Sequence, residues 1–251
     1  MIPQALLAAM LARADRPPAP SAELPPQVYF GAELGRPFLP VLPPRADDGA
    51  PAPAGWLAAP ASLVLAAKDG TVLHELGVGR WSAEDGALRR EMRGAASKDG
   101  RSAWHWQKVA EGEKTASVLV YLGAHGQILR RLDGADAPAG LPPAALSGDG
   151  AILLAALRTD GAWTATAYSF GGKELASVTK AHRVTALSVS EDGRRALVAW
   201  SGLDLPEMVT LLDLRRGERL DLPAERLPAG PWTLAPDGTL LAAGRPVPRT
   251  P

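Results

Sequence analysis

Cysteine is absent from the 251 residues of the chain. Disulfide frameworks, thiolate zinc sites and cysteine nucleophiles are therefore excluded. This absence leaves the compartment open, because a chain without cysteine suits the cytoplasm and the periplasm equally.

An excess of charge of either sign is also lacking. Lys and Arg together number 27, Asp and Glu together number 27, and the formal net charge is zero. A general nucleic-acid binder needs a basic face that neutralises phosphates, so the sequence predicts no nucleic-acid partner. Two isolated basic pairs, Arg194-Arg195 and Arg215-Arg216, stand at predicted turns, where we expect their side chains to be solvated.

Long hydrophobic runs are missing as well. No run reaches the roughly 18 apolar residues that a membrane-spanning helix needs, so no transmembrane segment is predicted. Peripheral association with a membrane through a partner stays open. Aromatic residues make up only 5% of the chain, yet seven of them are Trp.

Groupings that carry catalysis or hold cofactors are not visible. The chain has no G-x-S-x-G motif, no phosphate-binding loop and no dinucleotide-binding glycine pattern. A metal site needs several convergent ligands, and the four histidines show no ligand spacing. The sequence therefore predicts no cofactor and no metal site at His74, His105, His125 and His182.

The chain begins with two segments that differ from the rest. In residues 1–14 a short apolar core is followed by Ala12-Arg13-Ala14, which resembles a signal peptide; a short amphipathic helix is the alternative. Residues 15–60 are rich in Pro and Ala and predict an extended arm. Its apolar side chains are expected to anchor the arm, on the chain's own domain or on another subunit, through Tyr29, Phe30, Phe38 and Leu39.

A turn that recurs along the chain is its most informative feature. The tetrapeptides starting at Ser97, Ser147, Ser190 and Ala235 each end in Asp-Gly and lie 50, 43 and 45 residues apart. Asp hydrogen-bonds to the backbone ahead of it, and Gly adopts a positive φ. A period of 40–50 residues with several strands per repeat is typical of a β-propeller.

Counting the strands around these turns predicts an all-β fold, a small β-propeller of four blades over residues 61–245, with a tail at 246–251. One blade would join both chain ends, 230–243 with 62–76, and the others would span 88–132, 142–178 and 184–222. Such joining removes open sheet edges. Alternatives are a fifth blade that uses residues 28–42, a ring left open against a partner, or another sheet arrangement.

The turn Ala235-Pro236-Asp237-Gly238, followed by the apolar Thr239–Ala242, resembles the WD40-like and TolB-type propeller repeats of bacteria. Its relatives at Ser147 and Ser190 share the pattern. Pro is present in one of the four turns only, and the Trp-Asp dipeptide of WD40 repeats is absent. The resemblance implies a rigid disc that serves as a binding platform, and it carries over no catalytic residue.

Two further places are candidates for contact with a partner. Trp104 and Trp106 share one face of a predicted strand, where they would either form a stacking platform or fill the core between sheets. The loop 201–207 is a long insertion that contains Leu203 and Leu205.

These patterns favour a non-enzymatic scaffold subunit that binds other proteins, with the propeller as platform and the arm as docking element. The alternatives are a periplasmic ligand-binding or sensor propeller and a propeller hydrolase of lactonase or glycosidase type. The hydrolase predicts acidic or His residues converging at one mouth of the ring.

Overall fold

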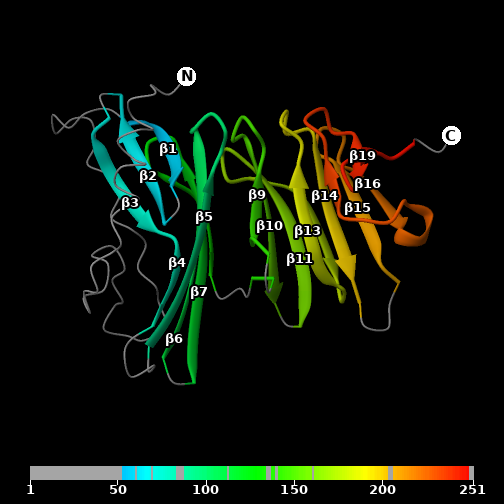
Figure 1. The fold of residues 1–251 in the computed structure, drawn as a ribbon, viewed down its shortest axis with the longest axis horizontal. Helices are drawn as coiled ribbons and strands as arrows, with labels where there is room; N and C mark the ends of the chain where they lie inside the picture. Colours follow the sequence, from blue (N-terminus) through cyan, green and yellow to red (C-terminus); the bar gives the residue numbers. More distant parts are fainter. Residues whose placement is uncertain are drawn as a thin grey trace. The chain divides into compact units, whose positions relative to one another are not determined.

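The computed structural model describes residues 53–59, 61–68, 70–82, 88–111, 113–133, 137–138, 141–159, 161–202 and 206–248. These residues form β-strands, turns and one short 3₁₀ helix, Ala224–Arg226 (Figure 1). None of the helical structure in this part of the chain is long and apolar enough to cross a membrane. The chain divides into two compact units, residues 1–134 and 135–251, which are considered separately.

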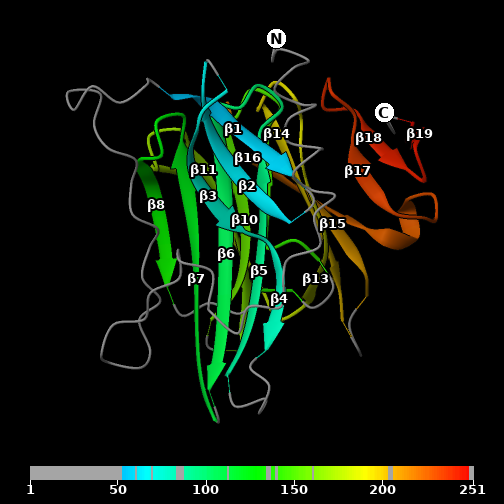
Figure 2. The same ribbon diagram turned by 60° about the vertical axis from the view of Figure 1, so that its left-hand side comes forward.

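The first unit contains two antiparallel sheets (Figure 2). The smaller has the order β1-β2-β3, with β1 (Pro53–Ala59), β2 (Ser62–Ala67) and β3 (Val72–Gly77). The larger has the order β4-β5-β6-β7-β8, with β4 (Gly79–Ser82), β5 (Leu88–Ala96), β6 (Ser102–Glu111), β7 (Lys114–Gly123) and β8 (Ile128–Asp133).

The second unit contains three sheets. The first runs β12-β11-β10-β9, with β9 (Ala144–Leu146), β10 (Ile152–Thr159), β11 (Ala162–Ser169) and β12 (Glu174–Lys180). The second runs β13-β14-β15-β16, with β13 (Arg183–Val189), β14 (Arg195–Ser201), β15 (Met208–Asp213) and β16 (Glu218–Pro223). The third runs β17-β18-β19, with β17 (Trp232–Leu234), β18 (Leu240–Ala242) and β19 (Arg245–Pro246).

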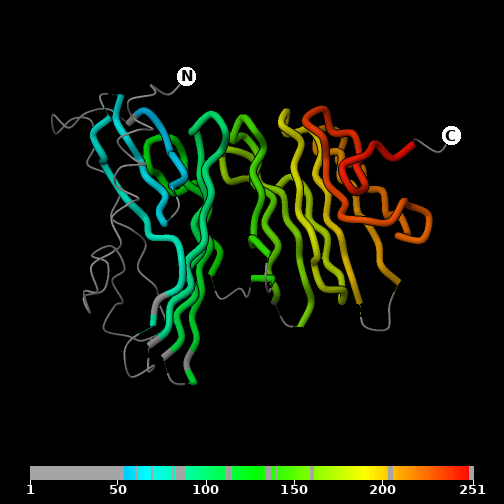
Figure 3. Tube along the Cα trace, in the orientation of Figure 1, coloured from blue at the N-terminus to red at the C-terminus, as the bar shows by residue number. Residues whose placement is uncertain are grey.

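Every sheet is a meander, in which each strand pairs with the next one along the chain (Figure 3). The burial of each strand follows its place in the meander. Inner strand β14 is buried at five consecutive positions, so both of its faces are covered. Edge strand β12 is mostly exposed, with Val178 as its one buried residue. An apolar run thus becomes a central strand, and a run interrupted by charges becomes an edge strand.

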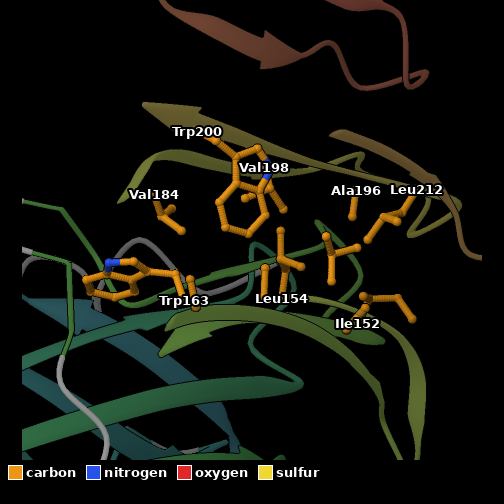
Figure 4. Packing of buried hydrophobic residues seen from close by; sticks show 12 residues of the cluster. Ile152, Leu154, Trp163, Val184, Ala196, Val198, Trp200 and Leu212 are labelled. Atoms are coloured by element: carbon orange, nitrogen blue, oxygen red, sulfur yellow. The ribbon is translucent and has the colours of Figure 1, made fainter. Parts of the chain in front are cut away.

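The core of the second unit lies between its two four-stranded sheets (Figure 4). Val198 and Trp200 of β14 face Leu154 of β10, and Trp163 of β11 packs in the same cluster. Trp200 is fully buried, and a Trp of this kind contributes much of the apolar area that a sheet-to-sheet contact buries. In the first unit a similar cluster forms around Trp56, with Leu63, Leu65, Leu76, Ala103, Val118, Val120 and Leu122.

An all-β fold of several antiparallel sheets is what the sequence predicted, but the strands at the chain ends differ. Residues 53–77 and 232–246 form separate three-stranded sheets, so the predicted blade that joins 230–243 with 62–76 is not among the sheets of the described residues. All five sheets are open. Residues 28–42, the alternative source of a fifth blade, lie outside the described residues.

The boundary of the Pro-rich arm also changes, because residues 53–59, which the arm was predicted to include, form β1. The register of β1 against β2 shifts between Pro53 and Gly55 and is regular from there to Ala59. Trp56 holds the strand in place: its indole Nε1 donates to the carbonyl of Gly123 at 2.7 Å, and its backbone N–H donates to the carbonyl of Gly100 at 2.8 Å. Contacts distant in sequence thus override the local signal of the prolines.

Candidate functional site

The recurring turns have a specific hydrogen-bond arrangement, which the turn at Ser190 shows. The Ser190 hydroxyl donates to Asp192 Oδ1 at 2.7 Å and accepts the backbone N–H of Arg195 at 3.0 Å. Asp192 Oδ1 also accepts the backbone N–H of Arg194 at 3.0 Å, and Gly193 has a φ of +65°. A buried serine and a surface aspartate together satisfy the backbone of the turn.

The turns at Ser97 and Ser147 repeat this arrangement with Asp99 and Asp149. The fourth turn lacks the hydroxyl and is one residue shorter. Ala235 N–H donates to the carbonyl of Thr239, four residues on, whereas Ser190 N–H donates to the carbonyl five residues on. The three serines thus bond within their turns, in agreement with a structural role.

Three turns of the second unit are bonded to one another through their backbones. The N–H of Glu191 donates to the carbonyl of Pro236 at 3.1 Å, and the N–H of Leu214 donates to the carbonyl of Arg194 at 2.8 Å. The Arg195 side chain adds a third link, because its Nη1 donates to the carbonyl of Gly238 at 3.1 Å. The turns before β14, between β15 and β16 and before β18 therefore form one connected surface.

This surface contains a hollow of about 400 Å³, which we call the turn hollow. Every described residue that lines it is charged: Asp192, Arg194, Arg195, Asp213, Arg215, Arg216 and Asp237. Because four of these residues are arginines and three are aspartates, the formal net charge of the lining is +1.

The carboxylates of the turn hollow are held by their own turns. Asp213 Oδ1 accepts the backbone N–H groups of Arg215 and Arg216, at 3.1 and 3.0 Å. Partial burial would raise the pKa of Asp192, but bonds from the Arg194 N–H and the Ser190 hydroxyl outweigh it and lower that pKa. The backbone N–H of Thr239 lowers the pKa of Asp237. Asp192 and Asp237 are therefore ionised at neutral pH, and one oxygen of each of the three aspartates accepts a backbone N–H.

The guanidinium groups are less engaged. Arg194 approaches Asp192 at 3.4 Å with 61% of its side chain exposed, and Arg216 approaches Glu218 at 3.9 Å with 72% exposed. Exposed pairs of this kind contribute little to stability and are readily exchanged. The guanidinium of Arg215 has no ion pair among the described residues. The hollow thus presents donors whose present bonds are weak.

A second hollow, of about 390 Å³, lies along strands β4, β5 and β6 and is lined by Arg80, Ser82, Arg89, Arg90, Glu91, Lys108 and Ala110. Burial of Glu91 raises its pKa, and bonds and charges of Arg93 and Arg80 lower it by more. Arg90 and Lys108 both have further interaction partners. We therefore take the turn hollow as the better candidate.

The sequence analysis did not predict the turn hollow. The sequence predicts solvated side chains at Arg194-Arg195 and Arg215-Arg216, and all four residues are exposed, yet the fold brings both pairs to one place. A shared pattern was available in the sequence, since each pair follows an aspartate by two residues. What the pattern could not show is that the two turns are neighbours.

Of the predicted contact residues, Trp104 and Trp106 are described, and both are buried, at 3% and 2% exposure. Arg93 lies over the Trp106 ring at 5.5 Å from its centroid. This geometry favours the core interpretation over an exposed stacking platform. Contact with a partner stays a prediction for the others, which lie outside the described residues: Tyr29, Phe30, Phe38, Leu39, Leu203 and Leu205.

His105, one of the four histidines that the sequence predicted to have no metal-binding role, has an unusual environment. His105 is 2% exposed, and its Nε2 donates to the carbonyl of Gly77 at 2.8 Å. Burial lowers the pKa of His105 to about 4 against the raising effect of the Gly77 bond, and the nearby His74 lowers it further. Among the described residues no group of three or more His, Asp or Glu side chains could hold a metal ion.

Fold and hollow together define an all-β protein of successive antiparallel meanders with a charged surface at its turns. No protein-family model matches the chain, and no curated protein matches it either. Among solved structures it is similar to the β-propeller domain of the Trilobed protease from Pyrococcus furiosus, with 13% identity over 49% of this chain and 40% of that one, at a TM-score of 0.37.

Two other solved structures are similar at the same level. Hydrazine synthase from Kuenenia stuttgartiensis has 14% identity over 76% of this chain and 73% of that one, with a TM-score of 0.40. TolB from Acinetobacter baumannii has 16% identity over 78% of this chain and 48% of that one, with a TM-score of 0.38. The chain thus spans less than half the length of the protease domain and of TolB. What it binds has to be inferred from its own side chains.

Proposed function

We propose that the chain is a non-enzymatic interaction module of β-propeller type, which binds another protein through the turn hollow. The observation that carries this proposal is the connection of three turns by the bonds Glu191–Pro236, Leu214–Arg194 and Arg195–Gly238. A surface whose backbone is already fixed loses little conformational entropy on binding. Successive four-stranded meanders are the building blocks of propellers, whose turns form such surfaces.

The chemistry of the hollow supports binding over catalysis. General acid–base catalysis needs a group whose pKa is near the working pH. Asp192 and Asp237 have lowered pKa values, and one oxygen of each accepts a backbone N–H. The lining residues include no histidine. A propeller hydrolase, one of the two alternative functions, predicts instead acidic or His residues that converge at one mouth of the ring, with at least one strongly shifted pKa.

The Pro-rich arm is a second part of the proposal, as the element that fastens the module to a larger assembly. Because β1 begins at Pro53, the arm to be tested ends at residue 52. A deletion that ran to residue 60 would remove β1 and with it the bond from Trp56 to Gly123, so it would report on folding as well as on docking.

The test is affinity purification of the tagged chain from its own organism, followed by mass spectrometry, with three further forms run in parallel. R194E/R215E changes the hollow, R226E changes an exposed arginine at the opposite end of the β15–β16 hairpin, and the third form lacks residues 1–52. We expect a stoichiometric partner with the natural chain and R226E, and a loss with R194E/R215E. Equal recovery with all forms, or no partner with any, contradicts the proposal.

A further inference from the structure

We propose that the turn hollow recognises carboxylates, and that its partner is a peptide segment with one or two Asp or Glu side chains. This inference rests on the proposed function and names the chemistry of the partner. Arg194, Arg195 and Arg215 would bind the carboxylates, and the connected turns would hold these three residues in place.

The arginines are available for a new acceptor. Arg195 uses Nη1 to bond the carbonyl of Gly238 at 3.1 Å, which fixes the direction of its side chain. Arg194 Nε lies 3.4 Å from Asp192 Oδ2 in an ion pair, with most of the side chain in solvent. Arg215 is exposed, and its guanidinium makes no ion pair within the described part of the chain. A guanidinium binds a carboxylate by two parallel N–H···O bonds, which gives such a pair its specificity.

The aspartates of the hollow explain why the ligand is a sparse acidic segment and not a dense polyanion. Asp192, Asp213 and Asp237 lie among the arginines and leave a net charge of only +1. A closely spaced row of phosphates would meet these carboxylates as well as the arginines, and like charges at contact oppose binding. A segment with one or two carboxylates can pair with the arginines and present its own backbone N–H groups to the aspartates.

The measurement is an NMR titration of the ¹⁵N-labelled full chain at fixed low salt with three probes. The first is the capped peptide acetyl-Gly-Glu-Gly-Asp-Gly-amide, the second its uncharged form with Gln and Asn, and the third inorganic tripolyphosphate. We expect the acidic peptide to shift the backbone amide signals of Arg194, Arg195, Arg215 and Arg216. The uncharged peptide should leave these signals unchanged, and tripolyphosphate should bind no tighter than the acidic peptide.

Variants show whether the arginines act by charge. R194E/R215E should weaken binding of the acidic peptide about tenfold, as expected when two exposed ion pairs are reversed. R226E should stay within about twofold of the natural chain. Because Arg215 makes no side-chain ion pair in the described structure, R215A serves as a second variant that keeps the fold, and it should weaken binding about threefold.

Four outcomes overturn the inference: equal shifts with both peptides, shifts located away from the turn hollow, tripolyphosphate binding tenfold tighter than the peptide, or no effect of R194E/R215E. Its failure is distinguishable from failure of the proposed function. A partner captured through the hollow but without acidic residues at the contact overturns only this inference. Peptide binding at the hollow without any captured partner contradicts only the proposed function.

Discussion

The indole N–H of Trp200 donates to the hydroxyl of Thr210 at 2.9 Å, and both side chains are completely buried. The same hydroxyl donates to Asp221 Oδ1 at 2.6 Å, and Lys180 Nζ donates to Asp221 Oδ2 at 3.2 Å. The chain of bonds therefore runs from β14 through β15 to β16 and reaches β12 of the neighbouring sheet. It gives the core of the second unit a polar link that the sequence did not reveal.

Replacing Thr210 by Val should destabilise the second unit by about 1–3 kcal/mol, because the Trp200 N–H then has no acceptor inside the core. T210S keeps the hydroxyl and should recover most of the loss, apart from the small cavity left by the methyl group. Urea unfolding followed by tryptophan fluorescence measures both variants. A T210V midpoint equal to that of the natural chain would show that the link adds nothing.

The hydroxyl of Ser190 is the centre of its turn, so S190A should cost about 1–2 kcal/mol. The change removes the donor to Asp192 and leaves the Arg195 N–H without that acceptor. S82A is the control, because Ser82 is exposed on edge strand β4 and its hydroxyl makes no hydrogen bond among the described residues, and it should stay within about 0.5 kcal/mol. Thermal unfolding compares the two, and equal melting temperatures would argue against the structural role of the turn serine.

A comparison of Gly193 with Gly217 distinguishes the cost of backbone strain from the cost of side-chain crowding. Both glycines have a positive φ, +65° and +68°. A Cβ at Gly193 would lie 2.9 Å from Ile152 Cγ1, whereas a Cβ at Gly217 would have no atom within 4 Å. We expect G217A to cost about 1 kcal/mol from the left-handed conformation alone. G193A should cost clearly more, because Ile152 has to move. If urea unfolding gives equal losses, the turn does not pack on Ile152 as described.

His105 should make the first unit sensitive to acid. Its pKa in the folded chain is about 4, below the usual 6.5, so the unfolded chain takes up a proton first as the pH falls. The stabilisation that comes from the neutral side chain is complete above pH 6.5 and is lost between pH 6.5 and 4. The loss amounts to about 3 kcal/mol for a shift of this size. Urea unfolding between pH 8 and 4.5 should therefore show a steeper decline for the natural chain than for H105Q.

The NMR signal of the His105 ring provides an independent check. Because Nε2 donates to the Gly77 carbonyl, the neutral ring carries its proton there. Its Cε1–H signal should not move between pH 8 and 5.5, whereas the signal of free histidine added to the sample titrates in this range. A His105 signal that titrates near pH 6.5 would contradict the buried environment.

Several strands could be predicted closely because their cause is local. Residues 152–157 and 196–200 are apolar runs that follow an Asp-Gly turn, and they lie in the central strands β10 and β14. Strand β1 could not be predicted, since Pro53 and the flanking Pro51 and Pro60 indicate a loop. It forms because Trp56 reaches the carbonyl of Gly123, 67 residues away. The pairing of the strands at the chain ends could not be predicted either. Residues 62–76 and 230–243 were expected to share one sheet, but each segment pairs with strands that are nearer in sequence.

By itself, the sequence determined the chemistry of each turn. Ser190, Asp192 and Gly193 lie within four residues, so their bonds and the positive φ follow from local geometry. Only the tertiary structure decided which turns meet. Arg194 and Arg215 come together because β14 and β15 pair, and Asp237 joins them because turn 190–195 bonds to turn 235–238. A binding surface made of separate turns depends on the packing of whole sheets, and that packing is not encoded in any short stretch of residues.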